Sequence, residues 1–224
     1  MTDDLPIIRS PRRRRIAFSV TPDGELCILA PPGVSDEYLQ QLARENQPLI
    51  DRLRRRAARV AVRPAARFIE GEEFWLWGNK YPLRFSRRVT AFDAAFILPA
   101  GTPQQVFASL ENFYRNALRR HIAPRIEEFA ARAGLSFDRF RISGAETQWG
   151  SCSPGGTISF SWMLAQCPVD LIDYVIWHEL THLEEMNHSP RFWAKLERHF
   201  PGARLARARL RRFEKMCPQF PAAK

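Results

Sequence analysis

Apolar and polar residues alternate at the start of the chain. Ile16, Phe18 and Val20 follow an arginine run at residues 12–15, and the alternation resumes at residues 25–29 after a Pro-Asp-Gly turn. A period of two is the pattern of a strand with one buried face, so this stretch predicts a β-hairpin over residues 12–30. The arginines then lie on or beside a strand, as a solvated face or as a patch that attracts anions.

The pattern then changes to that of a helix and back again. Ser35 is a suitable N-cap for a helix over residues 36–58, and Pro48 predicts a bend in it. Residues 68–97 are rich in aromatic side chains and contain glycine turns, which favours a second group of strands. Residues 1–100 are therefore expected to form a β-rich N-terminal α+β region.

A new region is predicted to begin after residue 100 and to extend over residues 101–224. Thr102 and Gln105 form a capping box for a long helix that Pro124 is expected to kink or split and Gly134 to end. Its expected apolar stripe consists of Val106, Leu110, Phe113 and Ala117.

Two further elements precede the chemically interesting stretch. Residues 148–152 and 157–160 flank a Ser-Pro-Gly-Gly turn, which predicts a hairpin, and residues 137–142 predict another strand. A helix is then expected from Pro168 to about Met186, with Asp170 and Asp173 near its positive end.

Composition limits the class of protein. The 224 residues are 45% hydrophobic and 26% charged, which is typical of a folded globular chain. A net charge of +10 suggests anionic partners, although a coding bias toward arginine is the favoured explanation. Four scattered cysteines, no apolar leader and no run of membrane-spanning length predict a cytoplasmic protein with reduced thiols and no membrane contact.

The predicted helix over residues 168–186 contains an HExxH motif. His178 and His182 are four residues apart, so a helix presents both imidazoles on one face, where they can bind a single ion. Zn²⁺ in hydrolases takes three protein ligands and leaves a position for water, and a nearby carboxylate must take a proton from that water. Glu179 is the candidate general base.

His188 is the favoured third ligand. Ser189 and Pro190 predict that a new helix begins directly after it, which places His188 at a corner where it can approach the first two histidines. Glu185, and less favourably Glu184, remain alternatives, but three ligands on one straight helix cannot surround an ion tetrahedrally. A cluster of core histidines without metal is the other alternative, and His121 and His199 are expected at the surface.

The stretch RISGAETQWGSCSPGGTISFSWML, followed by DYVIWHELTHLEEMNHSPRFW, resembles the YgjP-type predicted metal-dependent hydrolases, which are related to the WLM and SprT-like zincin peptidases. The resemblance is strong over residues 139–200 and weaker toward the N-terminus. It implies a zincin-like catalytic domain in which helices pack on a small, mostly antiparallel sheet. It also implies that His178, His182 and His188 bind Zn²⁺ and that Glu179 is catalytic.

These observations favour a zinc-dependent metallopeptidase with a polypeptide substrate. An edge strand containing Trp149, Gly150 and Ser151 would hold an extended substrate by backbone pairing, unless this strand is ordinary hairpin packing. One alternative is metal-dependent hydrolysis of a nucleotide or another phosphate anhydride. Another is a nucleic-acid-associated protein with a structural metal, which arginines in a helix over residues 203–216 would favour if they are not simply solvated.

Overall fold

The computed structural model describes residues 4–11, 13–21, 25–59, 66–146, 148–217 and 220. The chain divides into two units, residues 1–64 and residues 65–224. Residue 100, where the sequence places a boundary, lies inside the second unit between β7 (Phe96–Pro99) and α3 (Pro103–Ala133). These two elements share one core, because the ring centroids of Phe96 and Tyr114 are 5.6 Å apart.

The first unit contains a three-stranded sheet with the order β1-β3-β2. Strands β2 (Ala17–Val20) and β3 (Leu26–Ala30) pair antiparallel, which confirms the predicted hairpin. Strand β1 (Ile7–Arg9) pairs with β3 in parallel. Its three residues are too few for an alternating pattern to predict a strand. The predicted turn at residues 22–24 and Arg12 lie outside the described residues.

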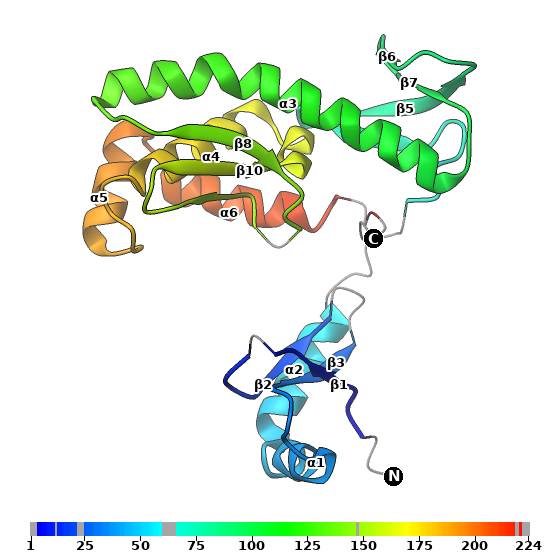
Figure 1. Ribbon diagram of the computed structural model, residues 1–224, viewed down its shortest axis with the longest axis vertical. Helices are drawn as coiled ribbons and strands as arrows, with labels where there is room; N and C mark the ends of the chain where they lie inside the picture. Colours follow the sequence, from blue (N-terminus) through cyan, green and yellow to red (C-terminus); the bar gives the residue numbers. More distant parts are fainter. Residues whose placement is uncertain are drawn as a thin grey trace. The chain divides into compact units, whose positions relative to one another are not determined.

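Two helices complete this unit (Figure 1). The Ser35 hydroxyl accepts a hydrogen bond from the Tyr38 N–H at the start of α1 (Asp36–Glu45), as the capping pattern predicts. The expected bend is a break at Asn46, after which α2 (Gln47–Arg59) begins. The helices contribute to a core of aliphatic residues that includes Leu39, Ala43 and Ile50 from the helices and Leu26, Ile28 and Ala30 from β3.

The second unit begins with a four-stranded sheet of order β4-β5-β7-β6, made of β4 (Glu73–Leu76), β5 (Asn79–Ser86), β6 (Ala91–Phe92) and β7. The turn between β4 and β5 uses positive φ angles at Trp77 (51°) and Gly78 (83°). The N–H groups of Trp77 and Gly78 donate hydrogen bonds to the carbonyls of Ala165 and Gln166, respectively. A Cβ at Gly78 would lie 2.8 Å from Pro168, so only glycine allows this close approach.

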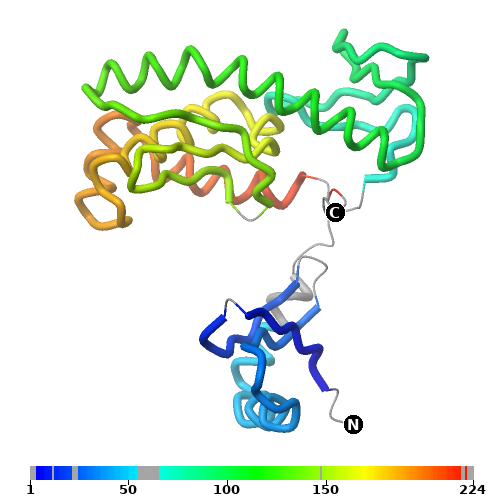
Figure 2. The backbone as a smooth tube through the Cα atoms, in the orientation of Figure 1, coloured from blue at the N-terminus to red at the C-terminus, as the bar shows by residue number. Residues whose placement is uncertain are grey.

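Helix α3 runs from this sheet past the rest of the unit (Figure 2). The predicted capping box at Thr102 and the left-handed Gly134 at its end are both present. The helix continues through Pro124 without a break, so the predicted split does not occur. Its buried stripe follows an i, i+4 spacing and consists of Val106, Leu110, Tyr114, Leu118, Ile122 and Ile126. After Leu110 this stripe differs from the predicted one.

A second sheet of order β8-β10-β9 lies across helix α4 (Val169–Thr181) (Figure 1). Strand β10 (Thr157–Ser161) pairs antiparallel with β9 (Gly150–Cys152), as predicted, and in parallel with β8 (Arg139–Ser143). A 3-10 turn η1 (Trp162–Gln166) leads to the last three helices, α4 (Val169–Thr181), α5 (Pro190–His199) and α6 (Ala203–Glu214). Segregated sheets and helices confirm the predicted α+β class.

None of the helices in the described parts of the chain combines the length and the apolar character that crossing a membrane requires.

Candidate metal centre

Helix α4 places the HExxH residues in the interior of the second unit. Its surface is apolar on nearly every side, and Leu171, Ile172 and Ile176 are at most 1% exposed. The helix ends at Thr181, with His182 as C-cap, and not at Met186 as the sequence suggests. The Thr181 hydroxyl donates to the carbonyl of Trp177, and the chain then turns away from the helix axis.

The turn after α4 brings three histidines together. Ring centroids of His178, His182 and His188 are separated by 4.8 to 5.0 Å, and one nitrogen from each ring lies within 4.8 Å of the other two. The Nε2 atoms of His178 and His188 are 2.9 Å apart. The Ser189 hydroxyl caps α5 by accepting from the Phe192 N–H, so His188 occupies the predicted corner directly before a helix. We call these three residues the histidine cluster.

Two hydrogen bonds orient the rings of the cluster. The Nδ1 atom of His182 lies 3.0 Å from the Glu185 carbonyl oxygen, which can only accept, so Nδ1 carries the proton and Nε2 presents its lone pair. The Tyr174 hydroxyl lies 3.4 Å from His178 Nδ1 and can fix that ring in the same way. Tyr174 was not predicted from the sequence, although it is four residues before His178 and therefore shares its helix face.

The local environment favours neutral imidazoles. Burial lowers the pKa of His178 to about 3, and the neighbouring histidines and Arg207 add to the effect. Burial also lowers the pKa of His182 and of His188. A histidine must be neutral to ligate a metal, so the cluster is in its ligand form at neutral pH.

Glu179 lies next to the cluster and is only 4% exposed. Burial raises its pKa to about 8, and its Oε2 atom has no hydrogen-bond partner among the described residues. A Cβ at Gly150 would lie 2.5 Å from Glu179 Oε1, so glycine in β9 makes room for this carboxylate. A buried carboxyl oxygen without a partner is costly unless a ligand or water completes its site.

The alternative ligands Glu184 and Glu185 point elsewhere. Lys195 of α5 lies 3.1 Å from a Glu184 oxygen and 3.5 Å from a Glu185 oxygen, so both carboxylates contact an ammonium group. Within the described residues, the cluster that could hold a metal contains histidines alone. None of the four cysteines belongs to this cluster.

These groups fit a divalent metal. Three neutral imidazole nitrogens from a helix and a following corner match the ligand number and type of a catalytic Zn²⁺ site. Tetrahedral coordination at about 2.0 Å requires nitrogens about 3.3 Å apart, close to the separation of the His178 and His188 Nε2 atoms. The unsatisfied oxygen of Glu179 adds an acceptor beside the ligands.

Among the described residues, one edge of β9 pairs with no other strand, and Gly150 of this strand lies against Glu179. The carbonyl of Trp149 accepts from the Ser161 N–H, and the Ser153 N–H donates to the Thr157 carbonyl. Because hydrogen-bonded pairs alternate along an antiparallel ladder, Ser151 also faces β10. The N–H and C=O groups of Gly150 and Cys152 therefore point to the other edge. Of the predicted residues Trp149, Gly150 and Ser151, only Gly150 directs its backbone groups to that edge.

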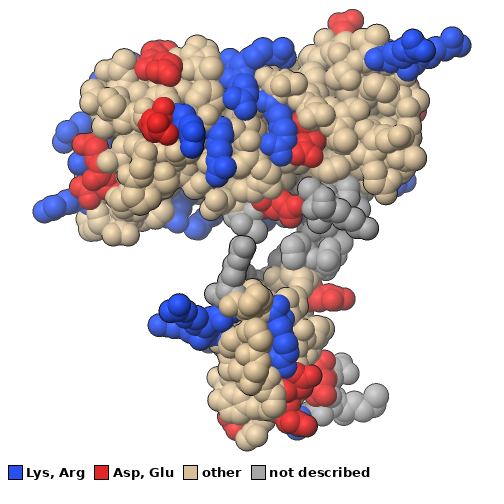
Figure 3. Space-filling view, viewed as in Figure 1, with Lys and Arg blue, Asp and Glu red and all other residues tan. Residues whose placement is uncertain are grey.

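The arginines of α6 are largely engaged within the unit. Arg204 and Arg207 lie over the Trp193 ring, at 5.0 and 5.1 Å from its centroid, and Arg209 pairs with Asp170. Figure 3 shows other Lys and Arg side chains gathered over α3 and the β8-β10 region. Arg139 and Arg141 on β8 line a depression of about 500 Å³ there.

Two solved structures resemble parts of the chain. The zymogen of the metallopeptidase abylysin from Pyrococcus abyssi is 24% identical, with a TM-score of 0.38 over 43% of this chain and 97% of that one. The zymogen of the metallopeptidase jannalysin from Methanocaldococcus jannaschii is 20% identical, with a TM-score of 0.37 over 42% of this chain and 96% of that one. No curated protein matches the chain.

A family model described as the YgjP-like metallopeptidase domain matches residues 14–213, which cover most of both units and the whole histidine cluster. The match extends over most of the chain and agrees with the resemblance seen in the sequence. The chain belongs to the YgjP-like family of metallopeptidases and is a metal-dependent hydrolase.

Proposed function

We propose that the protein is a zinc peptidase that cleaves an extended polypeptide segment bound along the free edge of β9. His178, His182 and His188 hold the metal in this proposal, and Glu179 is the general base. The observation that carries it is the buried Glu179 carboxylate beside three neutral imidazoles, with one oxygen that has no hydrogen-bond partner in the described part of the chain. Zn²⁺ suits an all-imidazole set with three protein ligands better than Mg²⁺ or Ca²⁺, which prefer oxygen ligands.

Glu179 moves the proton in this mechanism. A metal held by the three histidines would supply Lewis acidity for the peptide carbonyl and the attacking water. The Oε2 atom of Glu179 then receives a proton from the attacking water and delivers it to the departing amine. Burial raises the pKa of this carboxyl to about 8, which suits a group that both takes up and releases a proton near neutrality.

Strand β9 positions the substrate. The backbone groups of Gly150 and Cys152 can pair with alternate residues of an extended peptide, which brings its carbonyls past Glu179. Gly150 has no side chain, so the Glu179 carboxylate can lie directly against the strand that would hold the peptide. Hydrogen bonds to the main chain do not depend on the sequence of the substrate. Side chains near the edge of β9 would therefore determine which peptide sequences are preferred.

Replacement of Glu179 by Gln tests this assignment. Loss of the general base should lower the rate of peptide hydrolysis about 10²- to 10⁴-fold, while zinc content stays unchanged because the ligands remain. Activity should be measured on unfolded protein substrates and on a panel of nucleoside triphosphates, which the alternative function would require.

A matched control is Glu184→Gln, which removes a carboxylate paired with Lys195 outside the histidine cluster. It should leave the rate within about twofold of the unmodified protein. Full peptidase activity in the Glu179→Gln protein would refute the role of this residue.

A further inference from the structure

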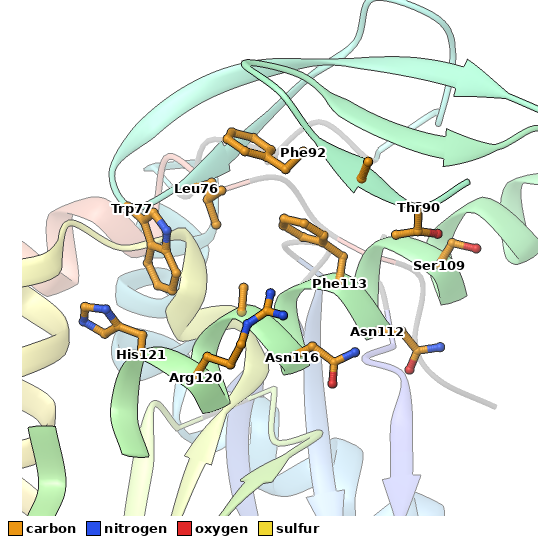
Figure 4. Close-up of a pocket in the computed structure, with 12 residues that line it drawn as sticks. Leu76, Trp77, Thr90, Phe92, Ser109, Asn112, Phe113, Asn116, Arg120 and His121 are labelled. Atoms are coloured by element: carbon orange, nitrogen blue, oxygen red, sulfur yellow. The ribbon is translucent and has the colours of Figure 1, made fainter. Parts of the chain in front are cut away.

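A groove of about 890 Å³ lies along α3, apart from the histidine cluster. Three separate segments line it: the end of β4 with the following turn, strand β6, and the middle of α3 (Figure 4). We call it the α3 groove, and the residues that matter to its chemistry are Trp77, Phe92, Asn112, Phe113, Asn116 and Arg120.

Aromatic rings form the apolar part of the groove. The rings of Phe92 and Phe113 are 5.9 Å apart, and Phe92 is 37% exposed at the edge of its sheet. The Trp77 and His121 rings are in tilted contact, with 4.9 Å between centroids. His121 is half-buried and not at the surface as expected, and its Nε2 atom has no hydrogen-bond partner among the described residues. These rings suit an apolar side chain.

The polar part is a ladder on one face of α3. Asn112, Asn116 and Arg120 are exposed and four residues apart, which separates them by about 6 Å along the helix axis. An extended peptide repeats every two residues, about 6.6 Å. Each carboxamide offers both a donor and an acceptor, so one Asn can bind the N–H and C=O of one residue. The ladder therefore has the spacing of an extended peptide backbone.

The charge of the groove is positive and unopposed. None of the twelve lining residues is Asp or Glu, and in the described chain Arg120 has no ion pair or hydrogen bond. Figure 4 shows its guanidinium directed toward the space between Trp77 and Phe113. A planar guanidinium beside apolar rings is suited to a carboxylate attached to an apolar residue.

We propose that the α3 groove binds the C-terminal segment of a polypeptide, with the terminal carboxylate on Arg120, the last side chain among the aromatic rings and the preceding backbone on Asn116 and Asn112. This is a second peptide site, independent of the metal chemistry proposed above. In a peptidase, such a site would retain a chain by its end while another part reaches β9.

Fluorescence anisotropy with the full-length Glu179→Gln protein tests the proposal without turnover. The probe is a fluorescein-labelled peptide, Gly-Ser-Gly-Ala-Ser-Ala-Leu, with a free C-terminal carboxylate, and mass spectrometry verifies that it stays intact. The same peptide with a C-terminal amide should bind about tenfold more weakly, because it lacks the charge that Arg120 contacts. Chelation of metal should leave binding of the free acid unchanged.

Variants identify the site of binding. Arg120→Gln should weaken binding of the free-acid peptide about tenfold, so that it binds no more tightly than the amide. Asn116→Ala should weaken binding of both peptides about threefold. Arg119→Gln is the matched control, since Arg119 is the adjacent exposed arginine on α3 and does not line the groove. It should bind like the parent, and circular dichroism verifies that each variant is folded.

Three results would overturn the proposal: equal affinity for acid and amide, full affinity in Arg120→Gln, or no binding of the acid at up to about 1 mM, which corresponds to about 4 kcal/mol. An oligonucleotide that binds through Arg120 when the peptide does not would assign the groove to another class of ligand. Because no outcome depends on turnover, failure here leaves the proposed peptidase function untouched, and failure of that function leaves this one.

Discussion

The histidine cluster and the α3 groove both combine aromatic rings with polar side chains, but they differ in packing. At the cluster, Glu179 is 4% exposed and a single added carbon at Gly150 would collide with it. In the groove, Asn116 and Arg120 are exposed and make no hydrogen bonds within the described chain. Chemistry requires groups held within a fraction of an ångström, whereas recognition of varied peptides tolerates mobile contacts. A small displacement of a side chain should therefore be costly at the cluster and tolerated in the groove.

Among the substitutions that test this difference in packing, Gly150→Ala is expected to have the largest effect. The added Cβ would lie 2.5 Å from Glu179 Oε1, so the carboxylate or β9 must move, and a displacement of about 1 Å at a reacting group costs about 100-fold in rate. Peptide hydrolysis should fall by this amount while zinc content is retained.

Gly155→Ala is the matched control, because a Cβ there would approach only the Ser153 Oγ, at 4.0 Å. Equal activities of the two alanine variants would show that the packing of β9 on Glu179 is unimportant.

Tyr174→Phe should have the next largest effect. It removes the hydroxyl beside His178 Nδ1, and loss of such a partner typically weakens metal binding about 10- to 100-fold. The measurement is zinc affinity by competition with a chromophoric chelator, so it does not depend on activity. Tyr81→Phe removes a hydroxyl that has no hydrogen bond in the described chain and should leave the affinity unchanged. An unaltered affinity in both variants would refute an orienting role for Tyr174.

A smaller effect is expected from Cys152→Pro. Proline removes the N–H that Cys152 presents at the free edge of β9 and spares the hydrogen bonds to β10, so the sheet should persist. KM for an extended peptide should rise about tenfold with little change in kcat, since one backbone hydrogen bond to the substrate is lost. Cys152→Ala keeps the N–H and should behave like the parent; an equal rise in KM in both variants would exclude backbone pairing.

The histidine cluster was predictable because its residues are close in sequence. The i, i+4 spacing of His178 and His182 gives a shared helix face, and the Ser189 and Pro190 cap signal places His188 at a corner. The end of α4 was placed five residues too late, because apolar residues continue the helical pattern beyond Thr181. The Thr181 hydroxyl bonds to the Trp177 carbonyl, and the His182 ring bonds to the Glu185 carbonyl. These local hydrogen bonds compete with continuation of the helix, and the hydrophobic pattern gives no sign of them.

The α3 groove was not predictable in the same way. Trp77, Phe92 and Arg120 come from three distant segments, and only the tertiary packing of the β4-β7 sheet on α3 brings them to one place. Phe113 was assigned to the core stripe of α3, but Tyr114 occupies that stripe and Phe113 turns toward the groove. A shift of one residue changes the face of a helix by 100°, which hydrophobicity alone does not resolve when adjacent residues are both aromatic.

The proposed function requires that His178, His182 and His188 bind one zinc ion. The most direct test is elemental analysis of the purified full-length protein, repeated for His178→Ala and His188→Ala and for His199→Ala, whose ring stacks on Trp177 outside the cluster. The unaltered protein and His199→Ala should contain about one zinc per chain, and the two cluster variants should contain little. Zinc content unaffected by both cluster substitutions would contradict the account.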